Sequence, residues 1–291
     1  MLCNRQQPTL QEYILTENTL EKILALTLFN NIMKKIITAL AFITLLITQS
    51  FAAAKDLYQI KIYHLKTAEQ EQMVEHYLEK AYLPALHRAG ITKAGVFKNI
   101  KSQATDKKDE LLIYVLVPYR SADEIAKIEQ KLLKDMAYAK DGSAYLDAAY
   151  DKTPYDRIET ILISAFDGSP KFNLSGVTTP KAERVYELRS YEGPTEKLYQ
   201  SKVKMFNTGD EIGLFKRLGF NAVFYGTVIA GTRMPNLMYM TTFANKADRD
   251  KHWEAFVNDS QWKTLSAVEE YKHTVSNTTI TFLYPTNYSD L

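Results

Sequence analysis

The chain repeats one pattern of segments twice, and this repeat limits its fold more than any other feature. The stretch 57–63, LYQIKIY, resembles 185–191, VYELRSY, and further along 119–124, YRSADE, resembles 243–248, FANKAD. Hydrophobic alternation and turn residues predict the order strand, helix, strand, strand, helix, strand in each copy. The expected segments are 57–64, 68–89, 94–100, 110–117, 122–138 and 156–166, then 184–191, 195–218, 221–230, 237–243, 246–257 and 276–284.

This order predicts an α+β fold made of two tandem ferredoxin-like βαββαβ units, each an antiparallel sheet with its helices on one face. The open face of each sheet needs cover, and two facing sheets in one chain would form a dimeric α/β-barrel-type arrangement. The domains expected are 1–54 (an upstream extension with a signal peptide at 33–54), 55–166, a linker at 167–181, and 182–291. Pro84 predicts a kink in the first helix near Leu83.

The second helix of each unit begins with a capping pattern. Ser121 with Glu124, and Asn245 with Asp248, place an acceptor at the N-cap and a carboxylate three residues later. We therefore expect these helices to begin at equivalent positions in the two units.

Alternation along the first strand of each unit separates an apolar set from a mixed set. Tyr58, Ile60 and Ile62 are apolar, as are Tyr186 and Leu188 in the second unit. We expect these sets to pack on the helices and the mixed sets to face the cleft between the sheets. The mixed sets hold the ligand-binding candidates: Gln59, Lys61, Glu187, Arg189 and Tyr191.

The amino-terminal segment is typical of a secretory signal. Lys34 and Lys35 precede an apolar run from Ile36 to Ile47, and small residues follow up to Ala54. Twelve residues span about 18 Å as a helix, short of a bilayer core of about 30 Å, so the run does not predict a membrane anchor. We expect cleavage near Ala54 and an exported, periplasmic or secreted protein. Met33 has the features of an initiator, which leaves open whether residues 1–32 are translated.

Composition removes several classes of function. A net charge of +2 offers nothing to nucleic acid or an anionic membrane, and the single cysteine, Cys3, rules out a disulfide framework or a zinc–cysteine site. No two of the five histidines have the helical spacing of a metal pair, and neither a Gly-x-Ser-x-Gly motif nor a glycine-rich phosphate loop occurs. We therefore expect no metal and no cofactor, and assign no catalytic residue.

The second unit resembles the NIPSNAP family. The resemblance is carried by Tyr186-Glu187-Leu188-Arg189-x-Tyr191, Phe215-Lys216-Arg217-Leu218-Gly219, Met234-Pro235-Asn236-Leu237-Met238-Tyr239-Met240, and the spacing Arg249, Trp253, Phe256, Asp259, Trp262. The first unit is similar in layout, chiefly through 82–91, YLPALHRAGI, and resembles the amino-terminal half of exported bacterial two-domain members. The resemblance implies a dimeric α/β barrel and an exported bacterial protein, with no agreed catalytic residues.

Three functions remain open. The first is binding of a small molecule or a protein in the cleft between the sheets, with Arg189 and Glu187 as a polar anchor or, in the simpler interpretation, as a structural ion pair with Lys61 or another charge. The second is a cofactor-independent monooxygenase or isomerase acting on a lipophilic or aromatic substrate. Its base would be His64, although alternation places that side chain with the helices. The third is an oligomerisation module that associates through exposed sheet edges, and a homodimer is left open.

Overall fold

The computed structural model describes residues 21–22, 24–38, 54–100, 110–174 and 176–291. They divide into two compact units, 1–53 and 54–291, and the second holds all the strands described below. In the first unit, residues 21–22 and 24–38 are helical and exposed. Residues 39–53, most of the predicted signal peptide, lie outside the described residues. None of the helices in the described ranges combines the length and hydrophobicity that a membrane span requires.

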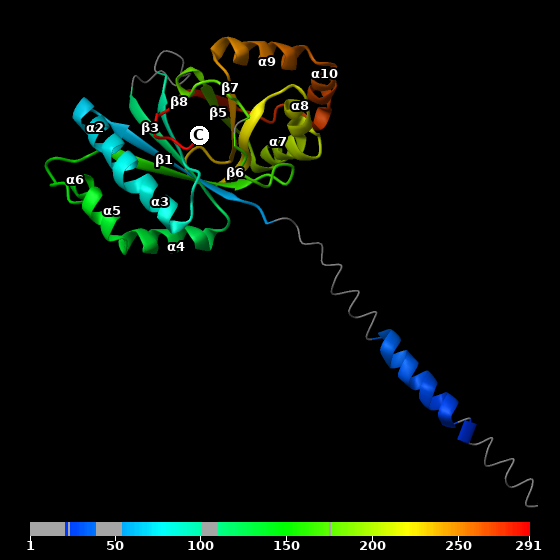
Figure 1. Ribbon diagram of the computed structural model, residues 1–291. Helices are drawn as coiled ribbons and strands as arrows, with labels where there is room; N and C mark the ends of the chain where they lie inside the picture. The colour runs from blue at the N-terminus through cyan, green and yellow to red at the C-terminus, as the bar shows by residue number, and fades with distance from the viewer. Residues whose placement is uncertain (1–20, 23, 39–53, 101–109, 175) are drawn as a thin grey trace, which may run out of the picture. The chain divides into compact units, whose positions relative to one another are not determined.

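The second unit contains two successive halves with the predicted order of elements (Figure 1). The elements of the first half are β1 (Leu57–Leu65), α2 (Ala68–Tyr77), η1 (Leu78–Tyr82), α3 (Leu83–Ala89), β2 (Gly95–Asn99), β3 (Leu111–Tyr119), α4 (Ala122–Leu133), α5 (Met136–Asp141), α6 (Ser143–Leu146) and β4 (Arg157–Ala165). Those of the second half are η3 (Lys181–Glu183), β5 (Val185–Glu192), α7 (Glu196–Asn207), α8 (Glu211–Arg217), β6 (Asn221–Ala230), β7 (Asn236–Phe243), α9 (Lys246–Asn258), α10 (Ser260–Ala267), η4 (Glu269–Tyr271) and β8 (Asn277–Pro285).

The described strands form a closed antiparallel barrel in the order β1-β3-β2-β8-β5-β7-β6-β4. Each half contributes four neighbouring strands, and the halves join where β2 pairs with β8 and where β4 pairs with β6. The helices of the two halves cover opposite sides of the barrel (Figure 1). The prediction of an α+β fold with antiparallel sheets is confirmed. The sheets meet edge to edge, however, because closure pairs the strand edges that two separate sheets would leave open.

The expectation for the two faces of the first strands is wrong. Tyr58, Ile60 and Ile62 project into the barrel, where they share one core with Tyr186 and Leu188 of the second half. The mixed sets project outward beneath the helices. Alternation separates the two faces of a strand but does not say which face is inside, and closure makes the inner face the drier one.

The predictions that rest on local sequence signals agree better with the structure than the assignment of strand faces does. Ser121 accepts a hydrogen bond from the backbone N–H of Glu124, and Asn245 accepts one from Asp248, so both predicted caps are confirmed. Near Pro84 the first helix widens into the π-helical turn η1 before α3 begins at Leu83. This irregularity adjoins the predicted kink, and Pro84 lies in the first turn of α3, where its missing N–H costs little.

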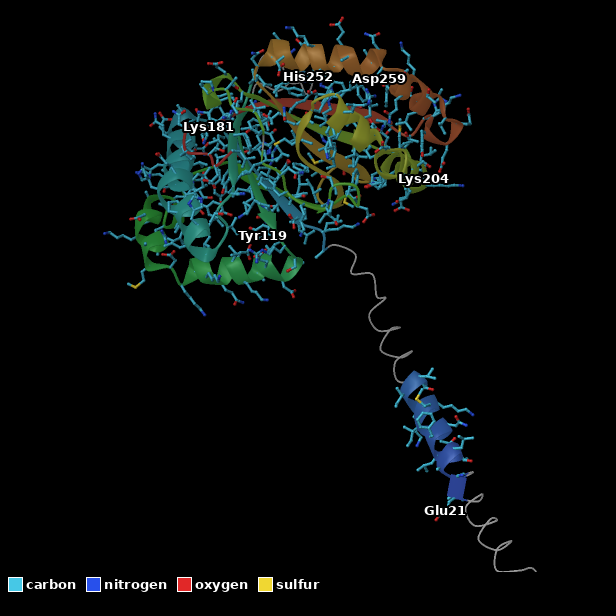
Figure 2. All side chains as sticks on the ribbon, turned by 45° about the vertical axis from the view of Figure 1, so that its right-hand side comes forward. Glu21, Tyr119, Lys181, Lys204, His252 and Asp259 are labelled. Carbon is cyan, nitrogen blue, oxygen red and sulfur yellow. The ribbon has the colours of Figure 1, made fainter. Side chains whose placement is uncertain are left out.

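Aromatic side chains fix the outer helices of the second half. Phe256 of α9 stacks on Phe215 of α8, with the ring centroids 4.8 Å apart, and Trp262 of α10 lies 4.4 Å from Phe256. Asp259, at the junction of α9 and α10 (Figure 2), accepts a hydrogen bond of 2.8 Å from Arg217 of α8. This packing gives the aromatic residues a structural role in holding the outer helices together.

Candidate functional site at the barrel mouth

The predicted anchor residues of the second half lie behind the sheet, beneath α9. Glu187 is fully buried and accepts hydrogen bonds from the Nε of Arg189 (2.7 Å), the Nε of Arg249 (2.8 Å) and the Nε1 of Trp253 (2.8 Å). The guanidinium of Arg189 also stacks on the Trp253 ring at 3.6 Å and donates to the Tyr191 hydroxyl at 3.0 Å. All these groups satisfy one another, so the arrangement fits the structural interpretation of the pair.

Electrostatics agree with this interpretation. Burial by itself would raise the pKa of Glu187, but the hydrogen bonds from Arg249 and the charges of Arg189 and Arg249 outweigh burial and hold its pKa below the ordinary value. The carboxylate therefore stays ionised as the centre of a buried ion cluster. Its charged partners are Arg189 and Arg249 of the same half, so of the two partners left open by the sequence, Lys61 or another charge, the second is found.

The corresponding residues of the first half also face helices. Gln59 is buried, and its Oε1 accepts a hydrogen bond of 3.3 Å from the hydroxyl of Tyr119 (labelled in Figure 2). The ammonium of Lys61 lies 5.3 Å from the centre of the Tyr82 ring, and burial lowers its pKa. The five predicted ligand-binding residues thus lie on the outer faces of the two halves. None of them lines the cavity described next.

One end of the barrel is hollow. A cavity of about 180 Å³ opens there, lined by residues of both halves. Its floor is apolar and its rim is polar. The apolar lining comprises Ile62, Leu112, Tyr114, Ile161, Leu188 and Met238, and the polar lining includes His64, Asn99, Glu110, Arg157, Glu159, Ser190, Arg233 and Asn236. A cavity of about 150 Å³ is large enough for a benzene ring, so this one takes a single-ring molecule.

His64 is the central polar group of the rim. It is 8% exposed and stands between two carboxylates: its Nδ1 is 3.1 Å from the Oε2 of Glu110, and its Nε2 is 3.4 Å from the Oε1 of Glu159. The Nη2 of Arg157 approaches the same Nδ1 at 3.0 Å. Among the described residues the Nε2 has no hydrogen-bond partner. A buried ring nitrogen of this kind is costly unless something pairs with it.

The opposite wall comes from the second half. The side-chain nitrogen of Asn236 donates a hydrogen bond of 2.8 Å to the hydroxyl of Ser190. Its Oδ1 is buried and has no hydrogen-bond partner within the described part of the chain. Arg233, in the turn between β6 and β7, donates to the hydroxyl of Thr279 at the rim. The rim therefore carries both signs of charge above an apolar floor.

These rim residues supply acid–base groups without a metal-binding arrangement. Across the described ranges, no cluster of three or more His, Cys, Asp or Glu side chains is placed to hold a metal ion. If Nδ1 carries the proton and donates a hydrogen bond to Glu110, the lone pair of Nε2 is left to accept a hydrogen bond or a proton. If Arg157 donates to Nδ1 instead, Nε2 carries the proton. Glu110 and Arg157 therefore select between a base and an acid at His64.

Sequence reasoning undervalued this site because it placed His64 on the wrong face of β1. With the inner face assigned to Tyr58, Ile60 and Ile62, the same alternation puts His64 inside the barrel at its mouth. Arg157 pairs with His64 across the ladder between β1 and β4, a register that the sequence did not provide. The polarity at the ends of β1, β3 and β4 was the available signal.

Two solved structures share this fold at low sequence identity. A protein from Lactobacillus acidophilus that is proposed to be a monooxygenase aligns with a TM-score of 0.51 and 12% identity, covering 79% of this chain and 94% of its own. A second proposed monooxygenase, from Fusobacterium nucleatum, gives 0.51 and 11%, covering 80% and 93%. A NIPSNAP family protein from Agrobacterium tumefaciens gives 0.33 and 20%, covering 38% and 99%.

No curated protein matches the sequence significantly. The NIPSNAP family model matches residues 186–290, which run from the second residue of β5 to beyond the end of β8. This range contains Glu187, Arg189, Arg249 and Trp253, the residues of the buried ion cluster. The resemblance inferred from those residues is confirmed: residues 186–290 of this chain are a NIPSNAP domain.

Proposed function

We propose that the protein binds a small, mainly apolar molecule with a weakly acidic hydroxyl in the cavity at the barrel mouth. The observation that carries this proposal is the Nε2 of His64, which is buried at the cavity wall, near Glu159 but without a hydrogen-bond partner among the described residues. An apolar ring would cover Ile62, Leu188 and Met238, and its hydroxyl would pair with His64. Arg157, beside the imidazole, would stabilise the resulting negative charge.

Titration with 4-nitrophenol tests this proposal, because the phenol and its phenolate differ in absorbance. The measurement is made on the purified protein at a pH where the free probe is protonated. We expect saturable binding together with the phenolate band, and loss of both in His64→Leu. His76→Leu is the matched control, because His76 is exposed on α2 and is not part of this cavity. Binding that His64→Leu leaves unchanged would contradict the proposal.

A second candidate function is proton-transfer catalysis, as in an isomerase or a cofactor-independent monooxygenase. It is supported by the pairing of His64 with Glu110, since a carboxylate that accepts from Nδ1–H orients the ring and leaves Nε2 as a base. Exchange of the α-hydrogens of phenylacetone in heavy water, followed by NMR, would detect such a base. Exchange that is faster with the protein, and that falls in His64→Gln, would favour the enzyme. Exchange no faster than in buffer would favour binding alone.

Export and architecture complete the proposal. The two halves, each with strand order 4-1-3-2 around the barrel, support tandem ferredoxin-like units fused into one dimeric α/β-barrel-type domain. The lysine pair and apolar run of residues 33–54 support export with cleavage near Ala54. Amino-terminal sequencing of the protein recovered from the periplasm should find a chain that begins near Lys55, and a start at Met33 or upstream of it would contradict cleavage. Closure of the barrel removes support for association through exposed sheet edges, since every described strand is paired on both sides.

A further inference from the structure

Two buried polar atoms at the barrel mouth have no hydrogen-bond partner within the described residues. One is the Nε2 of His64 on β1, and the other is the Oδ1 of Asn236 on β7. The two residues are 8% and 2% exposed, and both line the cavity. A buried polar atom left unpaired costs about 1–3 kcal/mol, so a bound molecule that pairs with both atoms would recover much of that cost.

These two atoms belong to opposite walls of the barrel. Two strands, β4 and β6, separate β1 from β7 on one side of the barrel, and four separate them on the other. Asn236 shares its face of β7 with Met238 and Met240 of the barrel core, and His64 shares its face of β1 with Ile60 and Ile62. Because β1 ends and β7 begins at the same barrel end, both side chains border the same cavity.

The neighbours of Asn236 define what its free atom can accept. Its amide nitrogen is already held at 2.8 Å by the hydroxyl of Ser190, on the adjacent strand β5. The amide oxygen is the atom that is buried without a hydrogen-bond partner among the described residues, and a carbonyl oxygen accepts a hydrogen bond but cannot donate one. The complementary group on the ligand is an O–H or N–H donor.

We propose that the cavity is specific for a single-ring molecule with a hydroxyl at each end: one weakly acidic, facing His64, and one a neutral donor, facing Asn236. This inference rests on the proposed binding function and adds the identity of the second recognition point. The ring spans the apolar floor between the two halves, and each half supplies one end of the recognition. A phenol with a hydroxymethyl group in the para position has this pattern.

Three probes of similar shape separate the two contacts. In 4-hydroxybenzyl alcohol both donors are present, 4-methylphenol lacks the second group, and 4-(methoxymethyl)phenol keeps the second oxygen as an acceptor only. Calorimetric titration of the purified protein should give a dissociation constant about tenfold lower for 4-hydroxybenzyl alcohol than for either of the others. Equal affinities for 4-hydroxybenzyl alcohol and either partner probe would overturn the inference.

Substitutions test whether Asn236 is the source of the tighter binding of 4-hydroxybenzyl alcohol. Asn236→Leu should bring the three affinities to within about twofold while leaving the binding of 4-methylphenol in place. Asn258→Leu is the matched control: Asn258 is exposed on α9, donates to the Glu254 carbonyl and is not part of the cavity, so the tenfold preference should remain. A preference that persists in Asn236→Leu would overturn the assignment to Asn236.

The same titrations distinguish this inference from the proposal beneath it. If all three phenols bind with equal affinity and all are lost in His64→Leu, the binding function stands and the second recognition point is wrong. If none of the three shows saturable binding, both are wrong. The comparison among probes in the unsubstituted protein decides the matter even if Asn236→Leu does not fold.

Discussion

The two halves of the barrel place their charged groups on opposite faces of the sheet. In the second half Glu187, Arg189 and Arg249 form an ion cluster on the outer face, beneath α9. In the first half the equivalent strand positions hold Gln59 and Lys61. There the charged groups gather instead on the inner face at the barrel mouth, around His64. The two halves therefore share one fold but place their charged clusters on different faces of the sheet.

This difference separates the family signature from the chemistry. The charged residues of the NIPSNAP signature that surround Glu187 pair with one another on the outer face. The half that matches the family only in layout provides the histidine, both carboxylates and one guanidinium of the cavity. A search for function guided by those charged residues alone would examine the outer face of the second half and miss the cavity.

The largest expected effect on stability comes from giving the second half the neutral glutamine that the first half has at the equivalent position of its first strand. Glu187→Gln leaves the buried guanidinium of Arg189 without a counter-charge and Arg249 with Asp250 alone, so we expect a loss of about 3–5 kcal/mol in the free energy of unfolding. Gln59→Ala, at the equivalent position, removes one neutral hydrogen bond and should cost about 1 kcal/mol. Urea unfolding followed by circular dichroism measures both. Equal losses would refute the contrast between the halves.

Acid should weaken the ion cluster through the same carboxylate. Because the pKa of Glu187 is held below its ordinary value in the folded protein, its contribution is fully present above the unfolded pKa of about 4.3 and is lost as pH falls below it. We expect the unfolding free energy to drop more steeply below pH ~4 in the unsubstituted protein than in Glu187→Gln. Parallel curves from urea unfolding over this range would show that Glu187 carries no such linkage.

A smaller effect is expected from the indole beside the cluster. Trp253→Phe keeps the ring beneath Arg189 but removes the hydrogen bond from Nε1 to Glu187, and should cost about 2 kcal/mol. Counting from the two N-caps, the equivalent residue on α4 is the exposed Glu129, and Glu129→Ala should change stability by less than about 0.5 kcal/mol. Thermal unfolding compares the two, and a Trp253→Phe protein as stable as Glu129→Ala would remove Trp253 from the cluster.

The smallest effects should be the same in both halves. Ser121→Ala and Asn245→Ala each remove the N-cap acceptor of equivalent helices, and each should cost about 1 kcal/mol. Chemical unfolding of the two variants, made separately, gives the comparison. A cost several times larger on one side would show that the halves differ at their helix starts as well as at their charges.

Local patterns predicted the elements well because propensity, caps and turns act over a few residues. The order of strands and helices, and the caps at Ser121 and Asn245, followed from such patterns. Which face of β1 turns inward depends on how β2 meets β8 and β4 meets β6, and those contacts join distant segments. Alternation alone could not choose between the two faces, and the choice decided the position of His64.

The candidate site residues divide in the same way into those that local patterns predict and those that only long-range contacts bring together. Arg189 and Glu187 were correctly recognised as a pair, since residues two apart on a strand share a face. Their partners Arg249 and Trp253 belonged to the same family signature, but only the fold of α9 onto the outer face brings them together. Predicting the cavity would have required two further facts. One is the strand register that sets Arg157 beside His64, and the other is the closure of the barrel that brings Asn236 of the second half to the same mouth.

The segment from Asp167 to Lys181 joins the two halves into one polypeptide, and it changes what the barrel mouth can contain. The strand ends of both halves surround this mouth, so a barrel assembled from two identical chains would present every rim group twice, in matched positions about a central axis. Here the position equivalent to His64 is Glu192, by the alignment of Tyr58 with Tyr186. A single covalent chain is free of that duplication. It can present the imidazole of His64 on one side of the mouth and the neutral amide oxygen of Asn236 on the other. The two ends of a bound molecule then meet different groups, so the cavity can bind it in one orientation.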